Sequence, residues 1–170
     1  MDIITLDPTE MQIAKWLAER RFLSSRAAGQ NGYENLTDKT AKELEELGVM
    51  GELAFCKYAN LYFQLRQSGD NAGKPDATIN GLTIDVKTAG FDTACLLLKA
   101  KEYRHAVFDY YVLMIRTGIN TFEYAGYTTG VDLVRASNLR IFENGGPPAY
   151  SMSQGRLFKG LPTTHIEPVL

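Results

Sequence analysis

The stretch KPDATINGLTIDVKTAG, residues Lys74 to Gly90, decides the fold that we expect for this chain. Apolar and polar residues alternate on both sides of Asn80-Gly81, a dipeptide that suits the two-residue turn of a β-hairpin because both positions tolerate a positive φ. This turn would pair Ile79 with Leu82, Thr78 with Thr83, Ala77 with Ile84, and Asp76 with Asp85. The sequence therefore predicts a tight hairpin.

One face of the predicted hairpin is apolar and the other carries charge. Opposed residues of an antiparallel pair share a face, so the apolar face takes Ala77, Ile79, Leu82, Ile84 and Val86. Asp76, Asp85 and Lys87 share the other face, where the two carboxylates would be opposed at a Cβ separation of about 5 Å. Like charges in that arrangement repel, and a cation held between them would remove the penalty. The charged face therefore predicts a metal site.

The order of these residues also resembles a known signature. Pro75-Asp76, then an eight-residue gap, then Asp85-Val86-Lys87 is similar in residue type and order to the motif of the PD-(D/E)XK nuclease superfamily. An acid-x-Lys triplet is a weak signal by itself. Here it ends a strand whose hairpin partner begins with Pro75-Asp76. The ordinary alternative is an exposed hairpin whose charges are solvated.

A second resemblance lies upstream of the hairpin. Thr40-x-x-Glu43 has the capping-box pattern and opens an amphipathic helix that we expect to run toward Leu65, with a break at Gly48 as one option. The run from Gly48 to Ala54 resembles the Gly-x-x-Gly-Glu-x-Ala opening that precedes the catalytic hairpin in many of these nucleases. Gly51 would let another backbone approach closely. Glu52 would then reach the site beneath the sheet, although a helical glutamate is ordinarily a solvated surface carboxylate.

The rest of the chain predicts further helices and strands. Asp7-Pro8-Thr9-Glu10 indicates a helix that begins at Pro8 and runs to about Phe22. A polar loop from Ser24 to Leu36 follows, in which Arg26 either contacts DNA phosphates or is simply solvated. We expect strands at Ala94–Leu98, Phe108–Ile115 and Thr121–Thr128, a helical turn at Val131–Ala136 and a terminal hairpin within Tyr150–Phe158.

Other polar residues are weaker candidates for a site. Lys99, Lys101, Arg104 and His105 form a basic cluster that would bind phosphates or remain a solvated surface. Asp70 is an additional metal ligand in one reading and a turn residue in the other. His165 lies in a tail that we expect to fray.

Composition places the chain among ordinary globular proteins. It has 170 residues, enough for one domain with a real core, and is 45% hydrophobic and 22% charged. A net charge of −2 argues against a protein that coats nucleic acid non-specifically, but a nuclease with acidic metal ligands and local basic patches remains compatible with it. Because no leader-like or membrane-spanning segment stands out, we expect a soluble, cytoplasmic protein.

The resemblance implies a fold and an activity. The fold would be a single α/β domain over residues 1–170, with a restriction-endonuclease-like core at about 40–135 whose mixed central sheet is flanked by helices. The activity would be Mg²⁺-dependent hydrolysis of phosphodiester bonds, with DNA as the expected partner and Mn²⁺ as a substitute metal. Asp76, Asp85 and the Val86 carbonyl would bind the metal, Glu52 would support it, and Lys87 would orient or deprotonate the attacking water. Arg26, Lys99 and Lys101 are the candidate substrate-binding residues, and double-strand cleavage would favour a homodimer.

Two other functions stay open from the sequence. A catalytically silent nucleic-acid-binding or structural module would keep the same fold, although the presence of all four expected side chains argues against it. Carbohydrate chemistry could use Asp76 and Asp85 as acid and base. That alternative leaves Lys87 without a role.

Overall fold

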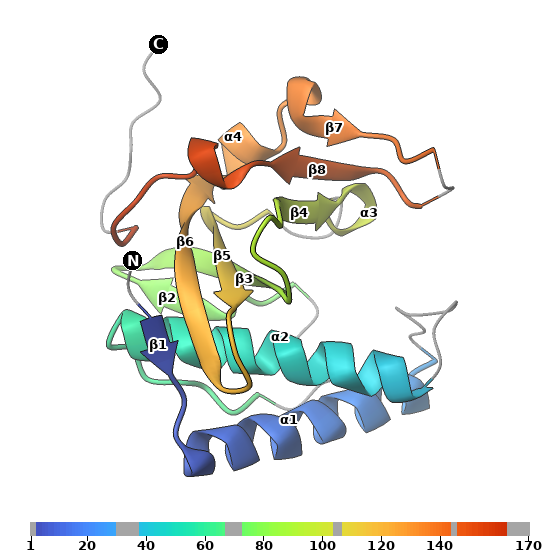
Figure 1. The fold of residues 1–170 in the computed structure, drawn as a ribbon. Helices are drawn as coiled ribbons and strands as arrows, with labels where there is room; N and C mark the ends of the chain where they lie inside the picture. The colour runs from blue at the N-terminus through green and yellow to red at the C-terminus, as the bar shows by residue number, and fades with distance from the viewer. Residues whose placement is uncertain (1–2, 30–37, 67–72, 104–106, 144–145, 163–170) are drawn as a thin grey trace.

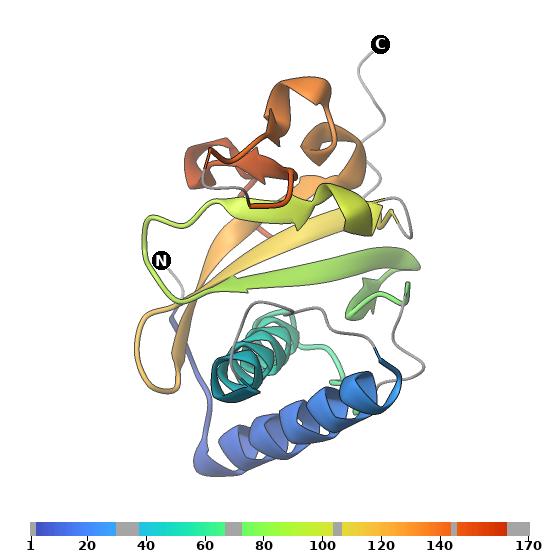
Figure 2. The same ribbon diagram turned by 90° about the vertical axis from the view of Figure 1, so that its right-hand side faces the viewer.

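The computed structural model describes residues 3–29, 38–66, 73–103, 107–143 and 146–162. Asp70, Arg104, His105 and His165 lie outside this part of the chain. Figures 1 and 2 show a layered α/β arrangement in which one long helix covers a face of a five-stranded sheet and a second long helix packs on the first, while a three-stranded sheet lies on the other side. The expected α/β class is confirmed. This arrangement places the predicted hairpin, β2 (Ala77–Ile79) and β3 (Leu82–Ala89), at one edge of the larger sheet.

Helix α1 (Pro8–Ala27) begins where the sequence predicts. The Asp7 carboxylate accepts hydrogen bonds from the Thr9 and Glu10 amides, and the Glu10 side chain accepts one from the Asp7 amide, which completes the capping box. The helix continues five residues beyond the predicted end at Phe22. Nothing between positions 23 and 27 breaks a helix, and the first left-handed residue is Gly29, with φ +68°.

Arg26 is therefore not in a loop, as predicted, but in the last turn of α1. Its guanidinium carbon lies 5.3 Å from the centroid of the Phe22 ring, one turn earlier in the same helix. A cation over an aromatic face is a favourable contact at a helix surface.

Helix α2 (Asp38–Tyr58) begins two residues before the predicted capping residue Thr40 and runs without a break through Gly48. It ends well before Leu65, so the predicted C-terminus was wrong. The Leu61 amide donates to the Cys56 carbonyl and the Asn60 amide to the Lys57 carbonyl, while Asn60 has φ 53°. This pattern of bonds around a left-handed residue terminates helices, and Asn is one of the few residues other than Gly that adopts it readily.

The larger sheet has the order β1 (Ile3–Thr5), β6 (Thr121–Thr129), β5 (Tyr110–Arg116), β3, β2. Strands β3 and β5 are parallel and all other neighbours are antiparallel, so the sheet is mixed, as expected. The hairpin register is confirmed for Ile79 with Leu82, Thr78 with Thr83 and Ala77 with Ile84. Asn80 and Gly81 both have positive φ, 51° and 82°, as a type I′ turn requires.

The smaller sheet has the order β4 (Leu96–Lys99), β8 (Ala149–Met152), β7 (Leu139–Arg140). A short helix, α3 (Ala100–Tyr103), follows β4 directly. The predicted terminal hairpin within Tyr150–Phe158 is wrong: β8 pairs with β4 and β7, and a 3₁₀ turn, η2 (Gln154–Arg156), follows it. The predicted helical turn near Val131 is present as α4 (Gly130–Leu133), followed by the 3₁₀ turn η1 (Ala136–Asn138).

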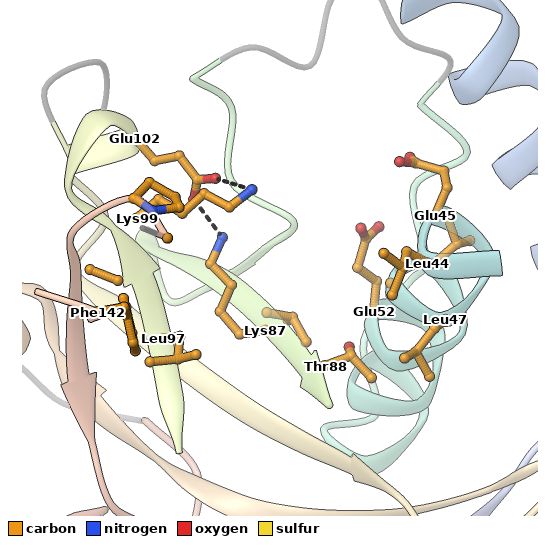
Figure 3. Close-up of a pocket in the computed structure, with 16 residues that line it drawn as sticks. Leu44, Glu45, Leu47, Glu52, Lys87, Thr88, Leu97, Lys99, Glu102 and Phe142 are labelled. Carbon is orange, nitrogen blue, oxygen red and sulfur yellow. Dashed lines mark hydrogen bonds and ion pairs between the residues drawn. The ribbon is translucent and has the colours of Figure 1, made fainter. Parts of the chain in front are cut away.

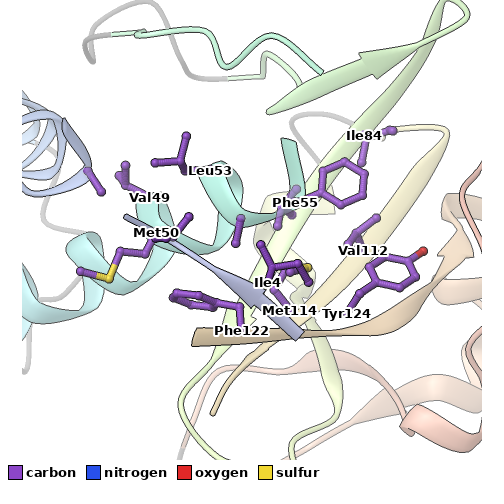
Figure 4. Close-up of a cluster of buried hydrophobic side chains, with 14 of the residues drawn as sticks. Ile4, Val49, Met50, Leu53, Phe55, Ile84, Val112, Met114, Phe122 and Tyr124 are labelled. Carbon is purple, nitrogen blue, oxygen red and sulfur yellow. The ribbon is translucent and has the colours of Figure 1, made fainter. Parts of the chain in front are cut away.

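Two apolar cores lie on the two faces of the larger sheet. On the helical side, apolar residues of α2 pack against the sheet (Figure 4). The α2 residues are Val49, Met50, Leu53 and Phe55, and the strand residues are Ile4, Ile84, Val112, Met114, Phe122 and Tyr124. On the other side, Tyr111, Leu113 and Ile115 of β5 pack against Leu96, Leu98 and Met152 of the smaller sheet. Alternate residues of one strand thus enter different cores, as the two-residue period of a strand requires. Among the described helices, none is long and apolar enough to cross a membrane.

Candidate active site

Asp76 lies just before β2, where the hairpin ladder ends. The predicted pairing of Asp76 with Asp85 does not extend the ladder, because the Asp76 amide donates to the Ile84 carbonyl at 2.8 Å. Oδ2 of Asp76 accepts a hydrogen bond from the Val86 amide at 2.7 Å. The Asp76 side chain therefore takes the place that a further strand residue would occupy beside Val86.

The side chains of Asp85 and Lys87 project from β3 toward the smaller sheet. They pair across the parallel ladder with Tyr111 and Leu113, whose side chains are in that core. Nζ of Lys87 lies 3.0 Å from Oδ2 of Asp85 and 3.4 Å from Oε2 of Glu102 in α3. One ammonium group thus lies between two carboxylates.

Glu52 approaches from α2, on the helical side of the sheet. Its Oε1 and Oε2 accept hydrogen bonds from the two terminal nitrogens of Arg21 at 2.7 and 2.9 Å. Nε of Arg21 donates to the Arg66 carbonyl, and the Arg66 side chain donates to the carbonyl of Pro75, next to Asp76. A continuous set of contacts therefore ties α1 and α2 to the segment that carries Asp76.

The packing of α2 on β3 depends on Gly51. A Cβ atom at this position would lie 1.8 Å from Oγ1 of Thr88, so no other residue fits without displacing the strand side chain. The close approach predicted for Gly51 is therefore present, and its partner is a side chain rather than a backbone. It brings Glu52, the next residue, beside the end of β3.

Burial and proximity shift the pKa values of the two aspartates in the same direction. Burial, followed by the carboxylates of Glu52 and Asp85, raises the pKa of Asp76 well above its ordinary value, against the opposing effect of the Val86 amide. Burial also raises the pKa of Asp85, although Lys87 opposes it. Both aspartates are therefore harder to ionise than exposed carboxyl groups.

The pKa of Lys87 is also raised, but for a different reason. Burial alone would lower the pKa of its ammonium group, but the carboxylates of Asp85 and Glu102 outweigh burial and raise that pKa above the ordinary value of 10.5. The side chain is therefore protonated at neutral pH and acts as a fixed positive charge.

A cleft of about 680 Å³ opens beside these residues. Its lining comes from α2, the end of β3, β4 and α3, together with Phe142, Gly146, Pro147 and Ala149, and includes Glu52 and Lys87 (Figure 3). Asp76 and Asp85 are not part of this lining. The cleft therefore meets the charged cluster through Glu52 on one wall and Lys87 on its floor.

The predicted substrate-binding residues lie in three different settings. Lys99 lines the cleft, with Nζ 3.7 Å from Oε1 of Glu102. Lys101 is exposed on α3 and Arg26 lies at the end of α1, and neither lines the cleft. Of the three, the structure brings only Lys99 to the cleft.

The donor atoms fit a hard divalent cation in part. Oδ2 of Asp85 is buried and makes no hydrogen bond, although Nζ of Lys87 lies 3.0 Å from it. The Val86 carbonyl points to the same side of β3 as its amide, toward Asp76, since a strand residue directs both groups one way. Two carboxylates and one carbonyl suit Mg²⁺, which binds oxygen and keeps several waters.

Glu52 does not complete that donor set, because both of its oxygens are bonded to Arg21. Accordingly, within the described ranges no three His, Cys, Asp or Glu side chains are grouped so that they could hold a metal. The residues that fit a cation are Asp76, Asp85 and Val86, with Glu52 acting on Asp76 through its charge.

Sequence reasoning missed two residues of the cluster. Arg21 lies next to Phe22, the predicted end of the first helix, but α1 continues past it and Arg21 pairs with Glu52 from within the helix. Glu102 lay within the basic cluster Lys99 to His105, where nothing indicated that it would reach Lys87. Both partners are far apart in sequence from the residues they contact, so no local signal could have identified them.

Comparison with known proteins leaves the superfamily resemblance untested. No family model, no curated protein and no solved structure matches this chain.

Proposed function

We propose that this protein hydrolyses phosphodiester bonds with the help of a divalent metal, most readily in DNA. The observation that carries the proposal is the convergence of Asp76, Asp85 and Lys87 at the end of the β2–β3 ladder, beside a cleft. Burial raises the pKa of both carboxyl groups, and Asp85 raises that of Asp76 further, so a cation bound beside them would favour their ionised forms.

Asp76, Asp85 and the Val86 carbonyl are the groups that would hold Mg²⁺, or Mn²⁺ in its place. When bound, the cation supplies Lewis acidity and offsets the charge that develops on the scissile phosphate. Asp76 is fixed for this role by the Val86 amide, and Asp85 keeps one buried oxygen free of hydrogen bonds. These residues need no nucleoside cofactor.

Lys87 would stabilise charge rather than remove a proton. Its ammonium is protonated at neutral pH because Asp85 and Glu102 flank it, so it has no lone pair to act as a base. A fixed positive charge beside a pentavalent phosphorus centre is most effective as negative charge accumulates there. The protonated state of Lys87 therefore favours charge stabilisation over proton abstraction.

Glu52 would act as a positioning residue. It lowers the acidity of Asp76 through its charge while Arg21 holds both of its oxygens. In this arrangement Glu52 supports the metal site through Asp76 or through water, and it is not itself a direct ligand.

A specific observation favours one alternative. Glu52 is matched by Arg21, and Lys87 is shared by Asp85 and Glu102, so much of the cluster is neutralised without a metal. A catalytically silent nucleic-acid-binding module would need no more than this. The two functions differ in one measurable respect: a nuclease cleaves the nucleic acid that it binds, and a silent module does not.

The test is cleavage of labelled single-stranded, duplex and branched DNA and of RNA, in Mg²⁺ and in EDTA. The proposal expects cleavage of at least one substrate in Mg²⁺, none in EDTA, and none by Asp85→Asn in either. Cleavage by Asp85→Asn at the wild-type rate would remove the proposal, because a contaminating or different activity would then be responsible. Binding without cleavage by the wild type would leave the silent module.

A further inference from the structure

The cleft beside Lys87 has walls of a different character from its floor. Leu44 and Leu47 of α2 form one wall, and Leu97 of β4 and Phe142 form the other (Figure 3). Leu44, Leu97 and Phe142 are 40%, 44% and 37% exposed, which is unusual for large apolar side chains that face a common space. The floor is polar, with Lys87 and Thr88.

The charges of the cleft do not suit a phosphate chain. Its lining contains three carboxylates, Glu45, Glu52 and Glu102, against two ammonium groups, Lys87 and Lys99. Both lysines are already paired with Glu102. Phosphate backbones are bound by an excess of positive charge, so the cleft would take an uncharged part of a ligand.

The size and shape of the cleft further limit the kind of ligand that it could bind. Its volume of about 680 Å³ is that of a site for a small organic group rather than for a double helix. Two facing apolar walls suit a flat group with apolar faces and polar edges, which is the description of a nucleobase.

On the basis of the proposed nuclease function, we infer that this cleft binds an unpaired nucleobase of the substrate. In a duplex the base faces are covered by their neighbours, so only a single-stranded or extruded base can place a face between Leu44 and Phe142. The phosphate attached to that base would lie outside the cleft, toward Asp85. Single-stranded nucleic acid, or a strand with an unpaired base, is therefore the substrate class.

The test measures binding without metal, so that it does not depend on turnover. Fluorescence anisotropy in EDTA would compare a short single strand, an abasic strand of equal length and a blunt duplex. We expect the wild type to bind the single strand best. Phe142→Ala and Leu44→Ala should each lower affinity for that strand about tenfold, the size of one lost base contact, while affinity for the abasic strand stays unchanged.

Phe91→Ala is the matched control, because Phe91 is 61% exposed and lies outside the cleft. It should bind all three ligands like the wild type. Leu44→Ala guards against misfolding, since alanine is a good helix former at an exposed position of α2. Equal affinity of the wild type for the abasic and normal strands would overturn the inference. So would cleft variants that bind the single strand normally, and the cleft would then suit an apolar side chain of a protein partner.

The outcome of this binding test can be distinguished from the outcome of the cleavage test of the nuclease proposal. Metal-dependent cleavage that Phe142→Ala leaves intact, on duplex and single strand alike, would keep the nuclease and remove the base-binding cleft. Base-dependent binding without any metal-dependent cleavage would keep the cleft and remove the nuclease.

Discussion

Two charge clusters flank the end of β3, and they are built differently. On the helical side, Arg21 and Glu52 form a matched pair in which both carboxylate oxygens are hydrogen-bonded and both side chains are 11% exposed. On the other side, the ammonium group of Lys87 forms ion pairs with both Asp85 and Glu102, and one oxygen of Asp85 is buried without a hydrogen bond. The matched pair fixes the geometry of the two helices, whereas the cluster around Lys87 is where we propose that a cation binds.

The largest effect should come from breaking the matched pair. Arg21→Ala leaves the Glu52 carboxylate buried without a counter-charge, which should lower the free energy of unfolding by about 3–5 kcal/mol. Chemical denaturation of the apo protein would measure it. Arg20→Ala is the matched control, because Arg20 is exposed on the same helix and lies over the Trp16 ring.

The comparison of Arg21→Ala with Arg20→Ala can also contradict this prediction. If Arg21→Ala unfolds no more easily than Arg20→Ala, the Arg21–Glu52 pair is not structural, and the contrast between the two clusters fails.

Lys87→Ala should have the largest effect on chemistry. The ammonium is not a metal ligand, so its loss should spare substrate affinity, measured in Ca²⁺, while the single-turnover rate falls about a hundredfold or more. Lys101→Ala, an exposed lysine outside the cleft, should cleave normally.

Lys87→Arg sharpens this result, because arginine keeps the charge and does not lose a proton near neutral pH. Partial activity would support charge stabilisation. Full activity of Lys87→Ala would remove Lys87 from the chemistry altogether.

Asp85→Asn should leave the metal-free protein as stable as the wild type, or more stable. The folded-state pKa values of Asp76 and Asp85 are raised, so the folded state binds more protons than the unfolded chain above the ordinary value of 3.8. Stability is then fully present below that pH and is lost as pH rises through the raised values. Urea unfolding in EDTA should show this decline.

The decline should be smaller in Asp85→Asn and should reverse when Mg²⁺ is added to the wild type. If Asp85→Asn unfolds more readily than the wild type across the same pH range, Asp85 has a structural role in place of the proposed one.

Glu102→Gln should have the smallest effect. Its side chain is 39% exposed and its oxygen lies 3.4 Å from Nζ of Lys87, so the ion pair is worth no more than about 1 kcal/mol. Cleavage should change by less than about fivefold. A loss as large as that of Lys87→Ala would mean that Glu102 takes part directly in the chemistry.

The hairpin and the start of α1 could be predicted because neighbouring residues determine them. Asn80-Gly81 fixes the turn through backbone angles that few other residues adopt, and the turn then sets the register of three pairs. Asp7 and Glu10 fix the helix start through hydrogen bonds within four residues. The predicted ends of α1 and α2 were wrong, because the polar residues after Phe22 do not break a helix and the left-handed Asn60 ends one.

By itself the sequence determined the hairpin, the apolar and charged faces of its strands, and the residues that resemble a nuclease motif. Only the tertiary structure decided that Arg21 holds Glu52, 31 residues away, and that Glu102 shares Lys87. It also decided that the ladder stops before Asp76, whose carboxylate turns to the Val86 amide. The physical reason is range: turns and caps depend on bonds between neighbours, whereas charge pairing depends on how α1, α2 and β3 cross.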